Sequence, residues 1–353
     1  MSLPVVARRS LVVVGLSLTF AAFLWALVPE GTAVSTVPAE PRRSDVQLFK
    51  RTIEGIRQGR GYYDAHGDEL RAGGYPTKSV FNWRQPLLYL VESRVPEALM
   101  QVCLALLAAL LLWETGKALP RDTFALVPMV NSCVGLLVPV AIYLTEAWSG
   151  AFIGLSLLSY ARRRERAGAL WGLAALFVRE LAGPYCLFAG CLALWRRRWR
   201  EVSVWVAGGS CFAVYYGVHA MQVMKHIRPE DRAHLKSWVS FGGLPFVASA
   251  VKANGLLLQA PRFGVAIVAV AIVAAWWNRR LPLHARVTLV MYCALFLAIG
   301  QPFNQYWGLL IAPTASLWLA YSWGGLRELW QPAPLMPDPR PVRQHLFSHA
   351  EHD

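Results

Sequence analysis

The sequence predicts an all-α fold, a polytopic bundle of about ten membrane-spanning helices (between about eight and twelve), and three observations support it. Hydrophobic residues make up 56% of the 353 residues and charged residues 16%, whereas a soluble domain carries about 25% charged residues. Apolar stretches long enough to cross about 30 Å of hydrocarbon recur along the chain. The basic excess, a net charge of +14, gathers in short clusters between these stretches. The combination excludes a soluble globular enzyme, a disordered tail and a disulfide-stapled secreted domain, and it predicts no nucleic-acid partner.

The predicted spans follow one another along the chain. The first, about 10–28, follows Arg8 and Arg9 and is interpreted as retained rather than as a removed signal peptide. The later ones are placed at about 97–113, 124–143, 146–161, 167–180, 182–195, 201–220, 262–278, 285–301 and 305–323. Residues 1–330 then form one transmembrane module, with outer loops at 29–96 and 221–262, and 331–353 form a polar cytoplasmic tail.

Lys and Arg in the short loops predict the orientation of the module, because cytoplasmic loops carry an excess of these residues. The clusters at 162–166 and 196–200 fall on one side, together with Arg8 and Arg9. We therefore expect a multi-pass integral protein, of the kind found in a bacterial inner (plasma) membrane, with both termini in the cytoplasm and its active site on the outer face.

The first outer loop opens with a helix signal. Ser44 and Gln47 form a capping box, and Val46, Phe49, Ile53 and Ile56 recur at helical spacing. The sequence predicts an amphipathic helix at 45–58 that lies flat on the outer membrane surface. Asp45 stands at its start, either as a reactive carboxylate or simply as a favourable partner of the helix dipole.

Other polar groups fall on the same predicted face. Arg84 lies between aromatic residues and suits a lipid phosphate, although an arginine that only anchors at the interface would look the same. Arg179 and Glu180 interrupt an apolar run, which marks a functional site or an ion pair of Arg179 with Glu180 or Glu146. The last outer loop offers hydrogen-bonding groups that suit a sugar.

Several short motifs together resemble the GT-C superfamily of integral membrane glycosyltransferases. They are Asp45-Val46-Gln47-Leu48-Phe49, Gly61-Tyr62-Tyr63-Asp64 and the stretch Phe81 to Tyr89, while Thr145-Glu146-Ala147-Trp148 and Val178-Arg179-Glu180 resemble later positions of the polyprenyl-phosphate-mannose branch. The resemblance implies transfer of a sugar from a polyprenyl-phosphate carrier to an acceptor hydroxyl on a lipid or glycan. The enzyme would be a hexosyl- or pentosyltransferase, and membrane lipids would surround it.

The resemblance also implies roles for individual residues. Asp45 is the expected general base. The donor phosphate is expected to bind Arg84, Arg179, Lys78 and His219. The sugar or the acceptor is expected to contact Tyr63, Asp64, Glu146, Glu180, Asn304, Gln305 and Tyr306. No residue set predicts a metal site, and a divalent ion stays open as a cofactor.

Two other classes of protein use membrane-embedded charges. A transporter or flippase of a lipid-linked precursor is the main alternative, although such proteins often have related halves and the sequence contains no internal repeat. A non-catalytic assembly protein is the third. The discriminating expectation is that an enzyme gathers Asp45, Arg84, Glu146 and Arg179 around one cavity on the outer face.

Overall fold

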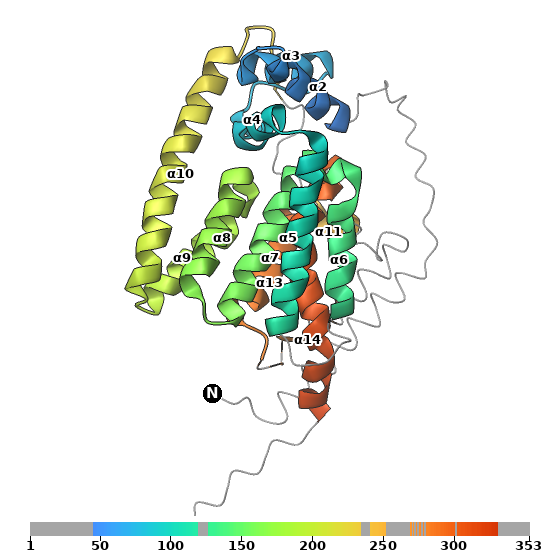
Figure 1. The fold of residues 1–353 in the computed structure, drawn as a ribbon, viewed down its shortest axis with the longest axis vertical. Coiled ribbons are helices and arrows are strands. Elements are labelled where there is room, and N and C mark those ends of the chain that lie inside the picture. The colour runs from blue at the N-terminus through green and yellow to red at the C-terminus, as the bar shows by residue number, and fades with distance from the viewer. Residues whose placement is uncertain are drawn as a thin grey trace, which may run out of the picture.

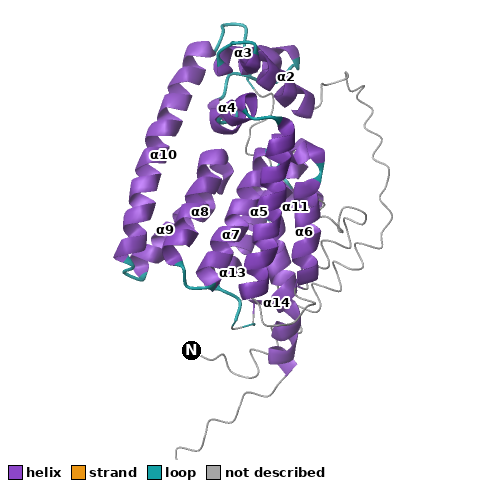
Figure 2. Ribbon diagram, in the orientation of Figure 1, coloured by secondary structure: helices purple, strands orange, loops and turns teal. Residues whose placement is uncertain are grey.

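A computed structural model describes residues 45–118, 126–233, 241–251, 280–300 and 302–330, with six further positions between 269 and 278. The described residues form helices joined by turns and loops and contain no strand, which confirms the all-α prediction (Figure 2). Ser44, the predicted first span at 10–28, most of the predicted span at 262–278 and the predicted tail at 331–353 lie outside the described residues.

Three short helices form a cap over one end of the molecule, at the top of Figure 1. They are α2 (Asp45–Arg57), α3 (Tyr62–Ala72) and α4 (Pro86–Arg94), and a short 3-10 turn, η1 (Val80–Asn82), precedes α4. The bounds of α2 confirm the helix predicted at 45–58. We call these elements the cap.

The surroundings of α2 correct one expectation. Its apolar side chains, including Leu48, Phe49 and Ile53, are buried, and the helix packs against α3 and α4. The apolar face is therefore covered by the protein itself, and it is not the side of α2 that would face a membrane. The spacing indicated an amphipathic helix correctly, but it could not indicate what covers the apolar side.

Below the cap, the remaining helices run side by side as a bundle (Figure 1). In chain order they are α5 (Glu97–Ala118), α6 (Val127–Leu137), α7 (Thr145–Ala161), α8 (Glu165–Val178), α9 (Gly183–Trp195), α10 (Trp199–His226), α11 (Gly243–Val251), α13 (Leu283–Ala298) and α14 (Ala312–Trp330). Short 3-10 segments connect them: η3 (Pro139–Tyr143), η4 (Glu180–Ala182) and η6 (Pro302–Leu310).

The prediction of ten spans is not confirmed. Among the described residues, α5 is the one helix that is both long and apolar enough to cross a membrane. Several predicted spans correspond to shorter helices. For example, α6 has 11 residues and is therefore about 16 Å long, and Pro139 lies just after its end. In addition, α10 continues to His226, past the predicted start of the second outer loop at 221.

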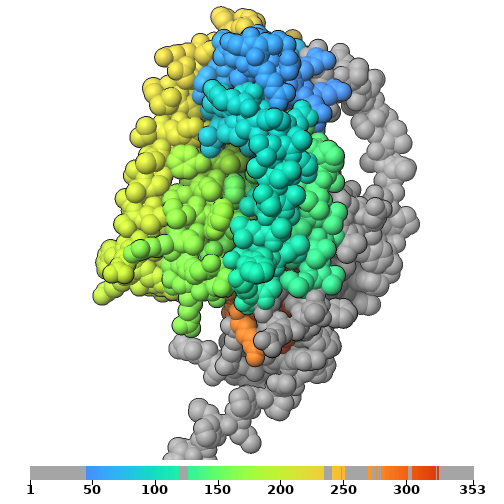
Figure 3. Space-filling view, viewed as in Figure 1, coloured from blue at the N-terminus to red at the C-terminus, as the bar shows by residue number. Residues whose placement is uncertain are grey.

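The outer surface of the bundle is apolar. Figure 3 shows α5, α6 and α10 on one broad face of the molecule. Large exposed apolar side chains lie on all three of these helices: Leu99, Val102, Leu106 and Trp113 on α5, Val127, Val130 and Val134 on α6, and Val206, Val214 and Val218 on α10. Large apolar side chains exposed in this number on three helices suit an interface with another protein or with lipid.

Two glycines allow η6 to enter the bundle. A Cβ atom at Gly150 of α7 would lie 2.1 Å from the carbonyl oxygen of Leu309, and one at Gly308 would lie 1.7 Å from the carbonyl oxygen of Ala250 in α11. No other residue fits at either position without moving the backbone. This close packing holds Asn304 and Tyr306, both on η6, beneath the cap.

Candidate functional site

A small cavity of about 80 Å³ lies where the cap meets η6. Cap residues supply most of its wall, and η6 closes it from the bundle side. The residues that contribute polar groups to it are Asp45, His66, Tyr75, Asn82, Arg84, Asn304 and Tyr306. We call this the Asp45 cavity. The structure thus brings together four residues that the sequence analysis singled out separately, from positions as distant as Asp45 and Tyr306.

Asp45 lies in the first turn of α2 and is half-buried. The Tyr75 hydroxyl donates a hydrogen bond to Asp45 Oδ1. Tyr75 is itself held in place, since its backbone N–H donates to the Leu70 carbonyl at 2.9 Å at the end of α3. One carboxylate oxygen is therefore oriented by the cap.

Arg84 is buried beside the cavity with its guanidinium group fixed by two contacts. Nη1 lies 2.7 Å from Glu146 Oε1, and Nη2 donates to the Tyr306 hydroxyl at 2.7 Å. Burial lowers the pKa of Arg84 while the carboxylate of Glu146 raises it, and the net result lies well above the usual range. Arg84 is consequently a permanent cation, and two of its five N–H groups are accounted for by these contacts.

Behind Arg84 the ion pairs continue into the bundle. Arg179 Nε lies 2.9 Å from Glu146 Oε1, and Arg179 Nη1 lies 2.8 Å from Glu180 Oε1. Glu146 is completely buried and Arg179 is 4% exposed. Both pairings that the sequence offered for Arg179 are therefore present. The four groups balance two positive charges with two negative ones, which buried charges require.

His66 faces the same cavity and was not predicted from the sequence. Thr52 donates its hydroxyl proton to the Leu48 carbonyl at 3.0 Å, so its oxygen must accept from His66 Nδ1 at 3.1 Å. That assignment leaves Nε2 as an acceptor, and Nε2 is buried with no hydrogen-bond partner. Burial, assisted by Arg84 and His219, lowers the pKa of His66 to about 3, which keeps the ring neutral.

Sequence spacing contained a signal for His66. Tyr62, His66 and Leu70 recur every four residues on α3, and all three are buried. This periodicity places the histidine on the inner face of a short helix. Tyr75 offered no comparable signal, because it lies in the loop after α3, where no periodicity applies.

A second pocket, of about 490 Å³, lies between α3, α4 and α10. It is lined by the predicted residues Tyr63, Asp64 and His219, together with His226. The Tyr63 hydroxyl lies 3.1 Å from His219 Nδ1, and Asp64 Oδ1 lies 3.4 Å from His226 Nε2. Burial raises the pKa of Tyr63 to about 12.

One aromatic pair borders both pockets. The ring of Tyr62 lines the second pocket and stacks on the ring of His66 at the Asp45 cavity, with 5.2 Å between centroids. The structure therefore divides the predicted site residues into two neighbouring groups. Five predicted site residues line neither pocket: Lys78 and Gln305 are exposed, and Glu146, Arg179 and Glu180 form the ion pairs behind Arg84. The expectation that Asp45, Arg84, Glu146 and Arg179 line one cavity is therefore met by Asp45 and Arg84 alone.

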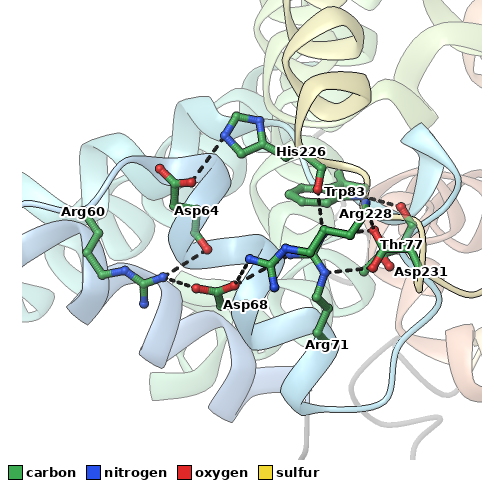
Figure 4. A network of polar contacts seen from close by, with 9 residues as sticks. All are labelled: Arg60, Asp64, Asp68, Arg71, Thr77, Trp83, His226, Arg228 and Asp231. Carbon is green, nitrogen blue, oxygen red and sulfur yellow. Dashed lines mark hydrogen bonds and ion pairs between the residues drawn. The ribbon is translucent and has the colours of Figure 1, made fainter.

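A polar network fixes α3 to the end of α10, as Figure 4 shows. Arg71 binds Asp231 through two contacts of 2.8 and 2.9 Å and donates to the His226 carbonyl at 2.6 Å. Asp68 lies 2.8 Å from Arg228 and 2.5 Å from Arg60. The hydrogen bond from Arg71 lowers the pKa of Asp231 to about 2. This network holds the cap, and with it both pockets, against the bundle.

Comparison of the chain with protein-family models, with curated proteins and with solved structures finds no match. Within the described ranges, no group of three or more His, Cys, Asp or Glu side chains is placed to hold a metal ion.

Proposed function

We propose that the protein is an integral membrane glycosyltransferase of the GT-C type, which moves a sugar from a polyprenyl-phosphate carrier to an acceptor hydroxyl. One observation carries this proposal. A carboxylate, Asp45, and a buried, permanently charged guanidinium, Arg84, line the same cavity. Transfer from a phosphate leaving group needs a base for the acceptor proton and a cation for the departing phosphate.

The proposed step is a displacement at the anomeric carbon. Asp45 takes the proton of the acceptor hydroxyl, the acceptor oxygen forms a bond to the anomeric carbon, and the bond from that carbon to the phosphate oxygen breaks. The electron pair leaves with the polyprenyl phosphate, and Arg84 stabilises its added charge. Glu146 and Tyr306 hold the guanidinium in a fixed direction, so little reorganisation is needed during the reaction.

The sizes of the pockets support a division of the substrates. The Asp45 cavity, at about 80 Å³, is smaller than ordinary ligand sites of about 300–1,000 Å³, so it would hold the reacting groups alone. The neighbouring pocket of about 490 Å³ is large enough for a sugar-sized group, and Tyr63, Asp64 and His219 would supply its hydrogen bonds.

The proposal includes a membrane location with several crossings, the cap on the outer side and both termini in the cytoplasm. Its support is the apolar surface formed by α5, α6 and α10 and the apolar composition of the chain. The bundle exposes apolar side chains, whereas the cap exposes charged ones, such as Lys50, Arg51 and Glu54 of α2. Lipid around the bundle and water around the cap would suit this difference.

The test is an assay of the purified chain in liposomes loaded with radiolabelled polyprenyl-phosphate sugars. Two products are measured: labelled acceptor, and labelled donor that has moved to the other leaflet. Transfer to an acceptor supports the enzyme. Movement of the donor between leaflets without transfer would contradict it and favour a flippase.

A further inference from the structure

A hollow of about 740 Å³ lies at the end of the bundle opposite the cap. Two turns form it, one between α7 and α8 and one between α9 and α10, at the lower end of the bundle in Figure 1. Its lining includes Arg164, Arg166, Arg198 and Arg200. The proposed transferase chemistry makes no use of this hollow.

The two turns have the same backbone. Arg163 and Arg197 both adopt the left-handed conformation, with φ of 57° and 54°. The N–H of Arg164 donates to the Ser159 carbonyl at 2.9 Å, and that of Arg198 donates to the Ala193 carbonyl at 3.0 Å. Glycine is the usual residue at such a left-handed position. Arginine at both positions places a positive charge on each turn.

Most of these arginines have no acidic partner. Glu114 contacts Arg162 and Arg164, while Glu165 and Glu201 lie 3.5 and 3.6 Å from Arg198. The remaining side chains are exposed and make no ion pair with any residue that the structure describes: Arg163, Arg166, Arg196, Arg197 and Arg200. Of these, Arg166 and Arg200 line the hollow, and its two glutamates, Glu165 and Glu201, balance only two of its four arginines, so the hollow is net positive and open to an anion.

Two further features fit a phosphate at the level of a membrane surface. Helices α8 and α10 begin at the hollow without a side-chain cap, so their first N–H groups add to the positive potential. Trp195 and Trp199 are 81% and 64% exposed beside it, and Leu170 and Leu194 are also exposed. Exposed tryptophan between arginine and apolar side chains is typical of a headgroup region, not of a site for a soluble polyanion.

We propose that this hollow binds the phosphate headgroup of an anionic phospholipid, at the end of the bundle opposite the Asp45 cavity. Arg166 and Arg200 contact the phosphate oxygens, and the acyl chains lie along the apolar surface of the bundle. The proposal requires a bilayer but no transferase activity, so each can fail without the other.

The experiment titrates phosphatidylglycerol into the detergent-purified full chain and counts bound lipids by native mass spectrometry. The test variant is Arg166→Gln/Arg200→Gln, and the control is Arg51→Gln/Arg94→Gln, which removes the same charge from exposed positions on the cap. Phosphatidylcholine and inorganic phosphate provide the comparison ligands. We expect phosphatidylglycerol to bind about thirtyfold more weakly to the test variant than to the wild type and the control.

Three outcomes would overturn the proposal. The first is an equal weakening of phosphatidylglycerol binding in the test and control variants. The second is binding of phosphatidylcholine as tight as that of phosphatidylglycerol. The third is complete displacement of the lipid by inorganic phosphate at matched concentration. A second variant, Arg163→Gly/Arg197→Gly, guards against a folding defect because glycine suits both left-handed positions. It should keep the thermal stability of the wild type and, because it removes charge beside the hollow and not from its lining, weaken phosphatidylglycerol binding less than the test variant does. Greater weakening than in the test variant would count against the site.

Discussion

Arginine side chains lie in opposite environments at the two ends of the bundle. Beneath the cap, Arg84 and Arg179 are buried and held by carboxylates at 2.7 to 2.9 Å. At the other end, the turns before α8 and α10 expose arginines that mostly have no ion-pair partner among the described residues. A buried pair fixes one geometry, which suits a reacting centre, whereas exposed cations create a diffuse potential, which suits a mobile headgroup.

The largest effect on stability should follow from removing the shared carboxylate at the buried end. In Glu146→Gln, Arg84 and Arg179 lose the negative charge between them, and an unpaired buried charge costs about 3–5 kcal/mol. Thermal unfolding in detergent should show this loss. The control is Glu54→Gln, an exposed carboxylate on α2, which should change stability little. Equal melting temperatures of the two variants would contradict a stabilising role of Glu146 between the two arginines.

The next effect concerns the contact that holds the cap to the bundle. Arg71→Gln removes the two-contact ion pair with Asp231 and should cost about 2 kcal/mol near neutral pH. The folded pKa of Asp231, about 2, lies below its usual 3.8. The contribution of the ion pair to stability is therefore fully present above pH 3.8 and is lost as the pH falls toward 2. The free energies of unfolding of the wild type and the variant should therefore become equal in acid. A constant difference between them would show that Asp231 is not the titrating group.

A smaller effect is expected from His66. Its folded pKa, about 3, lies below the usual 6.5, so the unfolded chain binds a proton between these values and the folded chain does not. Stability should fall by up to about 1.4 kcal/mol for each pH unit below 6.5. His66→Gln lacks this titration, so its stability relative to the wild type should improve from pH 7 to pH 5. No change would mean that the imidazole is not held neutral.

The smallest effect should appear at the exposed end. Arg166→Gln/Arg200→Gln removes two side chains that make no ion pair with a described residue, so stability without added lipid should change by less than about 0.5 kcal/mol. Unfolding measured with and without phosphatidylglycerol checks this. A large loss without lipid would mean that these arginines are structural.

The sequence predicted the helical class and several of the helices closely. Apolar periodicity placed α2, and apolar runs bounded by arginine clusters placed α7 and α9, because burial and helix ends leave local signals. The predicted span at 124–143 ran through Pro139, a local helix-stop signal that the length of the apolar run overrode, and α6 ends at Leu137. Periodicity did not predict that α2 is covered by α3 and α4, because that outcome depends on tertiary packing.

The candidate site was predictable only in part, for the same reason. Asp45, Arg84 and Tyr306 were singled out by motif and composition, yet nothing local indicated that one cavity joins them. Tyr75 lies 30 residues after Asp45, in a loop, and its contact with that carboxylate exists only in the folded cap. Lys78 fitted the predicted chemistry equally well but lies at the surface.

The most direct test of the account is the transfer rate of Asp45→Asn relative to Glu54→Gln, measured with a radiolabelled polyprenyl-phosphate sugar. The two substitutions remove one carboxylate each from the same helix, but only Asp45 lines the cavity. We predict a loss of about 100-fold or more for Asp45→Asn, with donor binding retained, and near wild-type transfer for Glu54→Gln. Transfer by Asp45→Asn within about threefold of the wild type would contradict a general base at this position.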